Sequence, residues 1–253
     1  MSAKAEHTDP ARRLGLLWGD RHRPGRRGRH ELSVARIVAA GTALADASGV
    51  AALSMRKVAE SLGVGTMSLY TYVPAKTDLV EVMVDTVYAE IAEAAGESGG
   101  DWRSRLTGVA TASYRAHLAH PWLAELPGNR TVLGPGAAAK YERELAAVDG
   151  IGLSDVEMDG VVALIGGLVE SAARRVGESA SAQTESGMSE NQWWLAHAPL
   201  LEAFTNREHF PLAARVGAAA GQTHGGAYAA DGGFGFGLAR ILDGVTLLID
   251  SRS

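Results

Sequence analysis

Cysteine is absent from this 253-residue chain, which excludes disulfides, thiolate metal sites and cysteine nucleophiles. No apolar run approaches the roughly 20 residues that a membrane span needs, and no apolar stretch with a cleavage site follows the arginine-rich start. Catalytic signatures are missing too, including G-x-S-x-G, H-E-x-x-H and phosphate-cradling loops. These absences predict a cytoplasmic protein that is not an enzyme, contacts no membrane and carries no metal or cofactor.

Strand-type alternation is also absent, and the apolar spacing from Trp102 onward is helical. The run from Gly232 to Gly237 is rich in glycine, but no strand precedes it and its spacing does not match a nucleotide-binding loop. Helix packing is therefore the favoured explanation for these glycines. The chain is predicted to be all-α.

Charge is distributed unevenly along the chain. Residues 1–80 hold 12 basic and 7 acidic residues, a net charge of +5, whereas residues 81–253 hold 12 and 22, a net charge of −10. A basic end on an acidic body is typical of a protein that binds a polyanion at one end. Residues 1–30 are predicted to form a flexible basic arm, because their arginines stand among proline and glycine without an apolar stripe. The arginines are Arg12, Arg13, Arg21, Arg23, Arg26, Arg27 and Arg29.

One hexamer within this arm, Leu14 to Gly19, is apolar. It is expected either to dock on the protein's own surface or to be disordered, and docking is the favoured alternative because it would cover the apolar side chains.

The stretch from Ser54 to Leu79 has the pattern of two short helices around a tight turn, followed by the start of a third. Gly63-Val64-Gly65 supplies the break, and residues 66–72 form a short helix whose hydroxyl groups avoid the face that Leu69 uses. A further helix is predicted to precede them, with Ser33 as its N-cap. This arrangement is typical of a helix-turn-helix, whose second helix enters the major groove of DNA.

The rest of the chain is predicted to be helical. A helix from Leu79 to Ile91 joins the N-terminal part to the body. The segments Val156–Val176 and Phe234–Ile249 carry apolar residues at helical spacing, with a further apolar face that suits burial against a second copy of the chain. Between them, Gly177 to Glu190 is predicted to be a flexible loop. The predicted domains are the arm at 1–30, a DNA-binding domain at 31–79 and a ligand-binding and dimerisation domain at 80–253.

These features closely resemble the tetracycline-repressor (TetR) family of bacterial transcription regulators. The resemblance is strongest over Leu32 to Leu79, and Phe234 to Val245 is similar to the final dimerisation helix of the subclass that contains the tetracycline repressor itself. In the middle, only short pieces such as His120-Pro121-Trp122 match. The resemblance implies an all-α homodimer with an N-terminal three-helix helix-turn-helix DNA-binding domain and a C-terminal helical ligand-binding and dimerisation domain.

The resemblance also implies a set of DNA contacts. Arg56 matches a base-contacting arginine and can donate two hydrogen bonds to a guanine edge, and Lys76 matches a lysine that grips the DNA backbone. Lys76 has the alternative of being a solvated surface lysine, and the arm arginines have that of a solubilising tail. Leu69 and Tyr70 are interpreted as core residues, because so short a helix needs apolar anchors. The other predicted contacts are Thr66, Met67, Ser68, Thr71 and Tyr72.

The effector pocket is predicted from composition alone, because large apolar walls with a few polar groups are how proteins hold drug-sized ligands. A metal at His117 and His120 would need a further ligand, so capping or pocket lining is favoured. The histidine with acidic support that magnesium-tetracycline binders use cannot be placed, which argues against tetracycline. The pocket candidates, each of which could instead be core, are His117, His120, Trp122, Leu126, Met158, Trp193, Trp194, His197, Phe204 and Phe210.

The predicted function is that of a repressor released from a palindromic double-stranded DNA operator by an unidentified small molecule. Two heads about 34–36 Å apart would place their recognition helices in successive major grooves. The alternative is a DNA-binding regulator without small-molecule input, which is controlled by a partner protein or acts as an activator.

Overall fold

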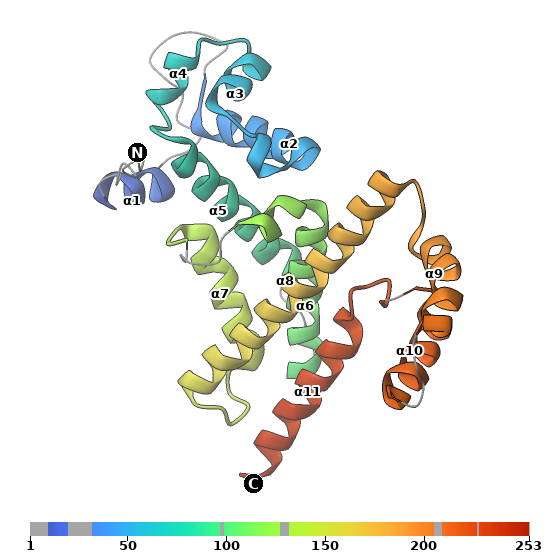
Figure 1. The fold of residues 1–253 in the computed structure, drawn as a ribbon. Helices are drawn as coiled ribbons and strands as arrows, with labels where there is room; N and C mark the ends of the chain where they lie inside the picture. Colours follow the sequence, from blue (N-terminus) through green and yellow to red (C-terminus); the bar gives the residue numbers. More distant parts are fainter. Residues whose placement is uncertain are drawn as a thin grey trace. The chain divides into compact units, whose positions relative to one another are not determined.

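The computed structural model describes residues 10–19, 32–96, 99–126, 132–204, 209–226 and 228–252. Within these ranges every regular element is a helix, which confirms the all-α prediction (Figure 1). The chain divides into two compact units, residues 1–162 and residues 163–253, and each is described by itself.

The N-terminal helix of the first unit is α1 (Pro10–Trp18). It forms where an irregular arm was expected, and Leu17 is only 1% exposed because it packs into the core of this unit. The prediction that the apolar hexamer docks on the protein is therefore confirmed at Leu17. The arginine-rich stretch at residues 21–30 lies outside the described residues.

Three helices form the head of the first unit: α2 (Val34–Ala52), α3 (Met55–Leu62) and α4 (Thr66–Tyr70). Ser33 caps α2 as predicted, since its hydroxyl accepts a hydrogen bond from Arg36 N at 3.3 Å. Ser54 caps α3 in the same way, through Lys57 N at 3.3 Å. Gly49 lies inside the span of α2 with φ 76° and ψ 158°, so the predicted break occurs there and a short helical piece follows it.

Helix α2 corrects the expectation that no apolar run of the chain approaches the length of a membrane span. Among the described residues it alone is long and apolar enough to cross a membrane by length and composition, with 19 residues. Part of this hydropathy comes from exposed alanines, and the buried face of the helix belongs to the head, where Ile37 and Val38 lie in the same core cluster as Val58 of α3 and Leu79 of α5. A core helix of a folded domain meets the same criterion.

Helix α5 (Lys76–Ala95) runs from the head to the other helices of the first unit (Figure 1). It packs against α7 through Asp85, which is fully buried and accepts a hydrogen bond from Ala137 N at 2.9 Å in the first turn of α7. Gly134 and Gly136 make this approach possible, because a Cβ at either position would collide with Asp85. The other helices here are α6 (Trp102–Ala119), the 3-10 helix η1 (Pro121–Glu125) and α7 (Pro135–Val148).

The second unit contains α9 (Glu190–Phe204), α10 (Pro211–His224) and α11 (Phe234–Asp250), together with most of α8 (Asp155–Ser186). Residues 177–186 continue α8, so the prediction of a loop from Gly177 was wrong over this stretch. A single glycine costs a helix only about 1 kcal/mol relative to alanine, and no proline interrupts these turns. The loop-like composition reflected solvent exposure, because residues 180–187 are all exposed.

Helix α11 packs against α8 within the second unit. A Cβ at Gly237 would lie 2.5 Å from Leu168 Cδ1, and one at Gly232 would lie 2.3 Å from Ala172 O. These glycines therefore permit close approach of the two segments, as the sequence interpretation held. Leu238, Leu242 and Val245 form the buried stripe of α11.

Candidate functional site

The turn between α3 and α4 is built by glycine and by the end of α3. Gly63 has φ 67°, which a residue with a side chain rarely adopts, and Val64 N donates to Ala59 O at 3.0 Å to close α3. Helix α4 then starts at Thr66, after the N-cap Gly65, and has five residues, so it depends on tertiary anchoring. Leu69, which is fully buried, supplies that anchor.

Most of the predicted DNA contacts lie on the solvent side of α3 and α4. Met67 is 78% exposed, Ser68 and Thr71 are exposed, and Thr66 is half-buried. These side chains belong to α4 and its C-cap, and the exposed ones are accessible to a macromolecular partner.

The two tyrosines of this segment differ in exposure, and Tyr70 differs from its predicted role. Tyr70 was interpreted as core but is 39% exposed, whereas Tyr72 is half-buried against the core cluster. Successive helical residues are about 100° apart, so Tyr70 cannot share the inward direction of its neighbour Leu69. Tyr70 is therefore an accessible polar residue that the sequence interpretation missed.

Arg56 extends from the first turn of α3, and its side chain is 82% exposed. Its Nε donates to Glu60 Oε1 at 2.7 Å, an i to i+4 pair, and this hydrogen bond with the Glu60 charge raises the Arg56 pKa above its ordinary value. Glu60 thus orients the guanidinium, which is charged at any physiological pH.

Two lysines close the C-terminal end of α2. Lys76 Nζ donates to Val50 O at 2.9 Å, and Lys57 Nζ donates to Ala52 O at 2.9 Å. A cation at a helix C-terminus satisfies carbonyl groups and interacts favourably with the helix dipole. An ammonium group has three donors, so this role for Lys76 is compatible with a second contact.

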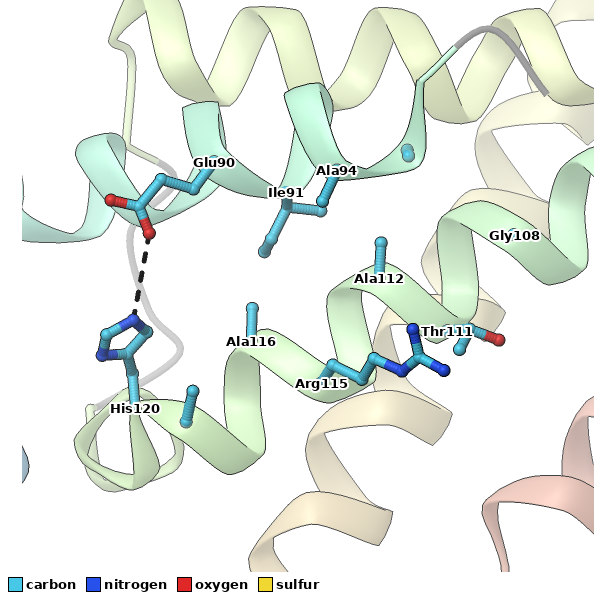
Figure 2. Close-up of a pocket in the computed structure, with 11 residues that line it drawn as sticks. Glu90, Ile91, Ala94, Gly108, Thr111, Ala112, Arg115, Ala116 and His120 are labelled. Atoms are coloured by element: carbon cyan, nitrogen blue, oxygen red, sulfur yellow. Dashed lines mark ion pairs between the residues drawn. The ribbon is translucent and has the colours of Figure 1, made fainter.

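A groove of about 560 Å³ lies between α5 and α6 in the first unit. Figure 2 shows Ile91 and Ala94 of α5 facing Ala112 and Ala116 of α6, which form an apolar floor of mostly small side chains. The polar groups of the groove are Glu90, Thr111, Arg115 and His120. The groove therefore offers acceptors and donors around an apolar surface, the usual composition of a small-molecule site.

His120 belongs both to this groove and to a link with the head. Its Nδ1 lies 2.8 Å from Asp46 Oδ1 on α2, and Trp122 Nε1 donates to the same oxygen at 2.7 Å. On the other side of the ring, His120 Nε2 lies 4.0 Å from Glu90 Oε2 (Figure 2). A carboxylate can only accept, so Nδ1 donates its hydrogen to Asp46. The His120 ring therefore has a carboxylate of the head at Nδ1 and a carboxylate of the groove, Glu90, near Nε2.

The other pocket candidates of the first unit do not line this groove. His117 and Met158 are buried, and His117 Nδ1 contacts Ser113 O of its own helix at 2.9 Å. Trp122 is fully buried beneath the head, and Leu126 packs partly buried against the core. Sequence reasoning found His120 and missed its neighbours, because Glu90 and Arg115 are ordinary surface residues in the sequence pattern.

In the second unit, a smaller cavity of about 270 Å³ lies between α9 and α10, and both Trp194 and Phe210 line it. Trp193 stacks on His197 with ring centroids 4.1 Å apart, and Phe204 is 87% exposed. Across the part of the chain that the structure describes, three or more histidine or acidic side chains nowhere gather in a way that could hold a metal ion.

Two family descriptions match the chain. "Bacterial regulatory proteins, tetR family" matches residues 37–83, the head and the start of α5, and "Tetracyclin repressor-like, C-terminal domain" matches residues 95–249. The second match covers more than half of the chain.

Relatives and solved structures agree with these matches. The chain is 37% identical to the HTH-type transcriptional repressor DrrR1 of Streptomyces coeruleorubidus over 96% of this chain and 88% of that protein. It is similar to the crystal structure of Streptomyces coelicolor ActR in complex with actinorhodin, with 25% identity, a TM-score of 0.67 and coverage of 86% of this chain and 98% of ActR. Apo ActR superposes with a TM-score of 0.69 at 24% identity, covering 88% and 98%. The helix-turn-helix geometry and these matches together show that the chain belongs to the TetR family of bacterial transcriptional regulators.

Proposed function

We propose that this protein is a repressor that binds a palindromic DNA operator as a homodimer and is released when a small molecule binds. The similarity to the repressor DrrR1 supports repression. The similarity to ActR, whose structures include complexes with actinorhodin and (S)-DNPA, supports a small-molecule input. The protein acts on the chromosome in this proposal, and therefore in the cytoplasm.

The proposed DNA surface is the exposed side of α3 and α4. Arg56 reads a guanine edge through two hydrogen bonds, and Met67 and Thr71 contact base edges or methyl groups. Ser68 and Tyr70 have single hydroxyls suited to phosphate oxygens, and Tyr70 joins the set because it is accessible. The half-buried members contribute at the edge of this surface; they are Thr66, Tyr72 and Lys76.

The observation that carries the proposal is the double role of His120, which lines the α5–α6 groove and bonds Asp46 of the head. A ligand that competes for the His120 ring, or for Glu90 on its other side, weakens the bond to Asp46. The ligand shifts the head only to the extent that it binds the detached arrangement more tightly than the attached one.

The groove also limits the chemistry of the effector. Its floor of small side chains accepts a flat apolar body, Arg115 and Thr111 offer hydrogen-bond donors, and Glu90 offers acceptors. We propose a mostly apolar ligand with at least one acceptor or anionic group placed near Arg115. We propose the α9–α10 cavity of the second unit, which Trp194 lines, as a secondary ligand site, with Trp193, His197 and Phe204 of the same helix α9 as further candidates.

The proposed dimer uses the outward faces of α8 and α11. Leu164, Phe236 and Leu247 are 61%, 73% and 72% exposed, although they lie on long helices with buried opposite faces. An apolar face on each of two helices suits a self-complementary interface between two copies.

The proposal is tested by selecting DNA from a random-sequence duplex library with the purified protein. We expect a palindrome with half-sites about one helical turn apart. Compounds, beginning with actinorhodin and (S)-DNPA, are then screened by thermal shift, and a stabilising compound should release the protein from the selected palindrome. The absence of selective DNA binding would refute the proposal. A regulator that binds DNA but is stabilised by no compound would favour control by a partner protein.

The role of His120 is tested with Asp46→Ala. We expect this variant to bind the palindrome about 2- to 30-fold more weakly and to respond less to the ligand, because the link is already broken. Asp46→Asn is the matched control, since its amide oxygen can still accept from both rings. Equal behaviour of Asp46→Ala and wild type would exclude this link from the mechanism.

A further inference from the structure

Helix α1 lies outside both segments that match the family descriptions and packs against α5. It has nine residues, and its one fully buried side chain, Leu17, joins the core that the head shares with α5. The helix is therefore a docked part of the first unit and not merely a carrier of arginines.

The charged contact between α1 and α5 involves a buried carboxylate. Arg13 Nε lies 2.9 Å from Glu81 Oε2 and 3.7 Å from Asp78 Oδ1, and the Asp78 side chain is 1% exposed. Among the described residues, neither oxygen of Asp78 accepts a side-chain or backbone hydrogen bond. A buried carboxylate without hydrogen bonds depends strongly on a nearby cation, and here that cation comes from α1.

The other end of α1 reaches a different helix. Trp18 Nε1 donates to Leu133 O at 2.9 Å, two residues before α7 begins. The start of α7 is itself held to α5 by the buried Asp85 through Ala137 N. Helix α1 thus contacts the head end of α5 through Arg13 and the segment that leads into α7 through Trp18.

We propose that α1 acts as a splint, meaning that it contacts both α5 and the segment before α7 and so restrains the junction between the head and the rest of the first unit. Arg13, Leu17 and Trp18 are then positioning residues for operator binding. They act through α5 by limiting how far the head can tilt relative to α7. A stiff joint lowers the entropy lost when the two heads of a dimer engage two half-sites together. Docked α1 therefore favours the full palindrome over a single half-site.

The direction of this effect rests on the proposed function, in which the ligand-free protein is the form that binds the operator. We assign the docked α1 to that form. A local role in head stability would weaken binding to half-site and palindrome equally, so the ratio of the two affinities separates the splint from a merely structural helix.

The experiment compares Arg13→Ala with Arg12→Ala, which removes the same charge from an exposed position on the same helix. Affinities for the selected palindrome and for a duplex with one half-site are measured by fluorescence anisotropy over a range of salt concentrations. Trp18→Phe, which keeps the ring and removes the N–H donor, tests the other end of α1. Each Arg13 measurement is repeated in an Asp78→Asn, Glu81→Gln background.

We expect Arg13→Ala to weaken palindrome binding about 2- to 30-fold, with half-site binding and the salt slope unchanged. Trp18→Phe should shift the same ratio in the same direction, and Arg12→Ala should leave it at the wild-type value. In the Asp78→Asn, Glu81→Gln background, Arg13→Ala should have no further effect. Equal results for Arg12→Ala and Arg13→Ala would overturn the inference, as would a reduced salt slope, which indicates direct phosphate contact.

A second measurement does not need DNA. The chain has no cysteine, so labels can be placed at Ala39→Cys in the head and Glu142→Cys on α7, and labelled chains are mixed with excess unlabelled protein. Arg13→Ala should broaden the distance distribution between the labels, and Arg12→Ala should not; an unchanged distribution for Arg13→Ala refutes the splint. If wild type binds no duplex selectively, the proposed function fails while this measurement still decides the inference.

Discussion

The head and the second unit handle their apolar side chains differently. In the head, Ile37, Val58 and Leu69 are fully buried, although α3 and α4 have only eight and five residues. In the second unit, by contrast, many large apolar residues are exposed. They include Leu164, Trp193, Leu195, Leu200, Leu201, Phe204, Phe210, Leu212, Val216, Phe236 and Leu247.

This difference separates the head, whose large apolar residues are mostly enclosed within one chain, from the second unit, which exposes many of them in the single chain. Isolated exposed apolar residues are normal, but extended exposed faces mark surfaces that bind something. The core of the head is completed by residues of α5, α1 and η1 in the same chain, and the exposed side of α3 and α4 forms the proposed DNA surface. The exposed apolar side chains of the second unit are of the kind expected where a second copy of the chain binds.

The strongest test of this contrast is Leu247→Glu on the exposed face of α11. We expect the dimer dissociation constant to rise by about 100-fold or more, because a charge would be desolvated in both copies. Sedimentation velocity measures the change, and Gln183→Glu, at an exposed polar position on α8, is the control. Leu242 is unsuitable for this test because it is only 6% exposed within its own chain. A stable Leu247→Glu dimer would remove this face from the interface.

Within the head, Leu69→Ala should lower the free energy of unfolding of the first unit by about 2–5 kcal/mol, because it leaves a cavity in a closed core. Urea denaturation followed by circular dichroism measures this. Met67→Ala is the matched variant on the same helix, since Met67 is 78% exposed, and it should change stability by no more than about 0.5 kcal/mol. Similar losses for the two variants would mean that α4 is not anchored as described.

Arg56→Ala should weaken binding to the selected palindrome by about 5- to 150-fold and relax the preference at one base pair. Arg240→Ala removes an exposed, acid-paired arginine from α11 in the second unit and should leave DNA binding unchanged. Competition with single-base variants of the palindrome measures both effects. A uniform loss across all sequences would reassign Arg56 to the DNA backbone.

The smallest expected effect concerns how the helices are capped. Head helices α2 and α3 use the uncharged Ser33 and Ser54, whereas α6 uses Asp101, which accepts from Ser104 N at 2.8 Å. Hydrogen bonds from the Ser104 backbone and hydroxyl lower the Asp101 pKa below its ordinary value of 3.8.

A lowered folded-state pKa means that the cap stabilises the protein above the ordinary Asp pKa and that this contribution disappears as pH falls through the lowered value. Acid titration of wild type and Asp101→Ser should therefore show that the variant loses part of its sensitivity in this range. Identical titrations would show that Asp101 contributes nothing to acid stability.

The sequence predicted the head well because its signals are local. Ser33, Ser54 and the glycine turn specify helix ends within three or four residues, and the buried Leu69 follows from helical spacing. The same local reasoning failed for Tyr70, since whether a tyrosine at this point faces the core depends on how α4 packs against its neighbours. It also failed for residues 177–186, where an exposed helix and a loop share the same polar composition.

The groove could be predicted only in part. His120 was a candidate because it lies three residues after His117 on a predicted helix, but Glu90, Arg115 and Asp46 had no distinguishing pattern. Their relation arises from segments that are far apart in the chain, as in the contact between Asp46 and His120. The α1 contacts have the same origin. In the sequence, nothing distinguishes Arg13 from the other six arginines of the arm, and only the folded structure shows that Asp78 and Glu81 of α5 lie beside it.

By itself, the sequence determined the helical class, the helix-turn-helix, the uneven charge and the resemblance to a family, because each is written in neighbouring residues or in composition. Tertiary structure alone decided which side chains of α4 reach solvent, what surrounds His120, and that α1 docks on α5. These features depend on packing between segments that are distant in the sequence. The hydrophobic effect that drives this packing is non-directional, so the neighbouring residues do not specify which distant segment each side chain will contact.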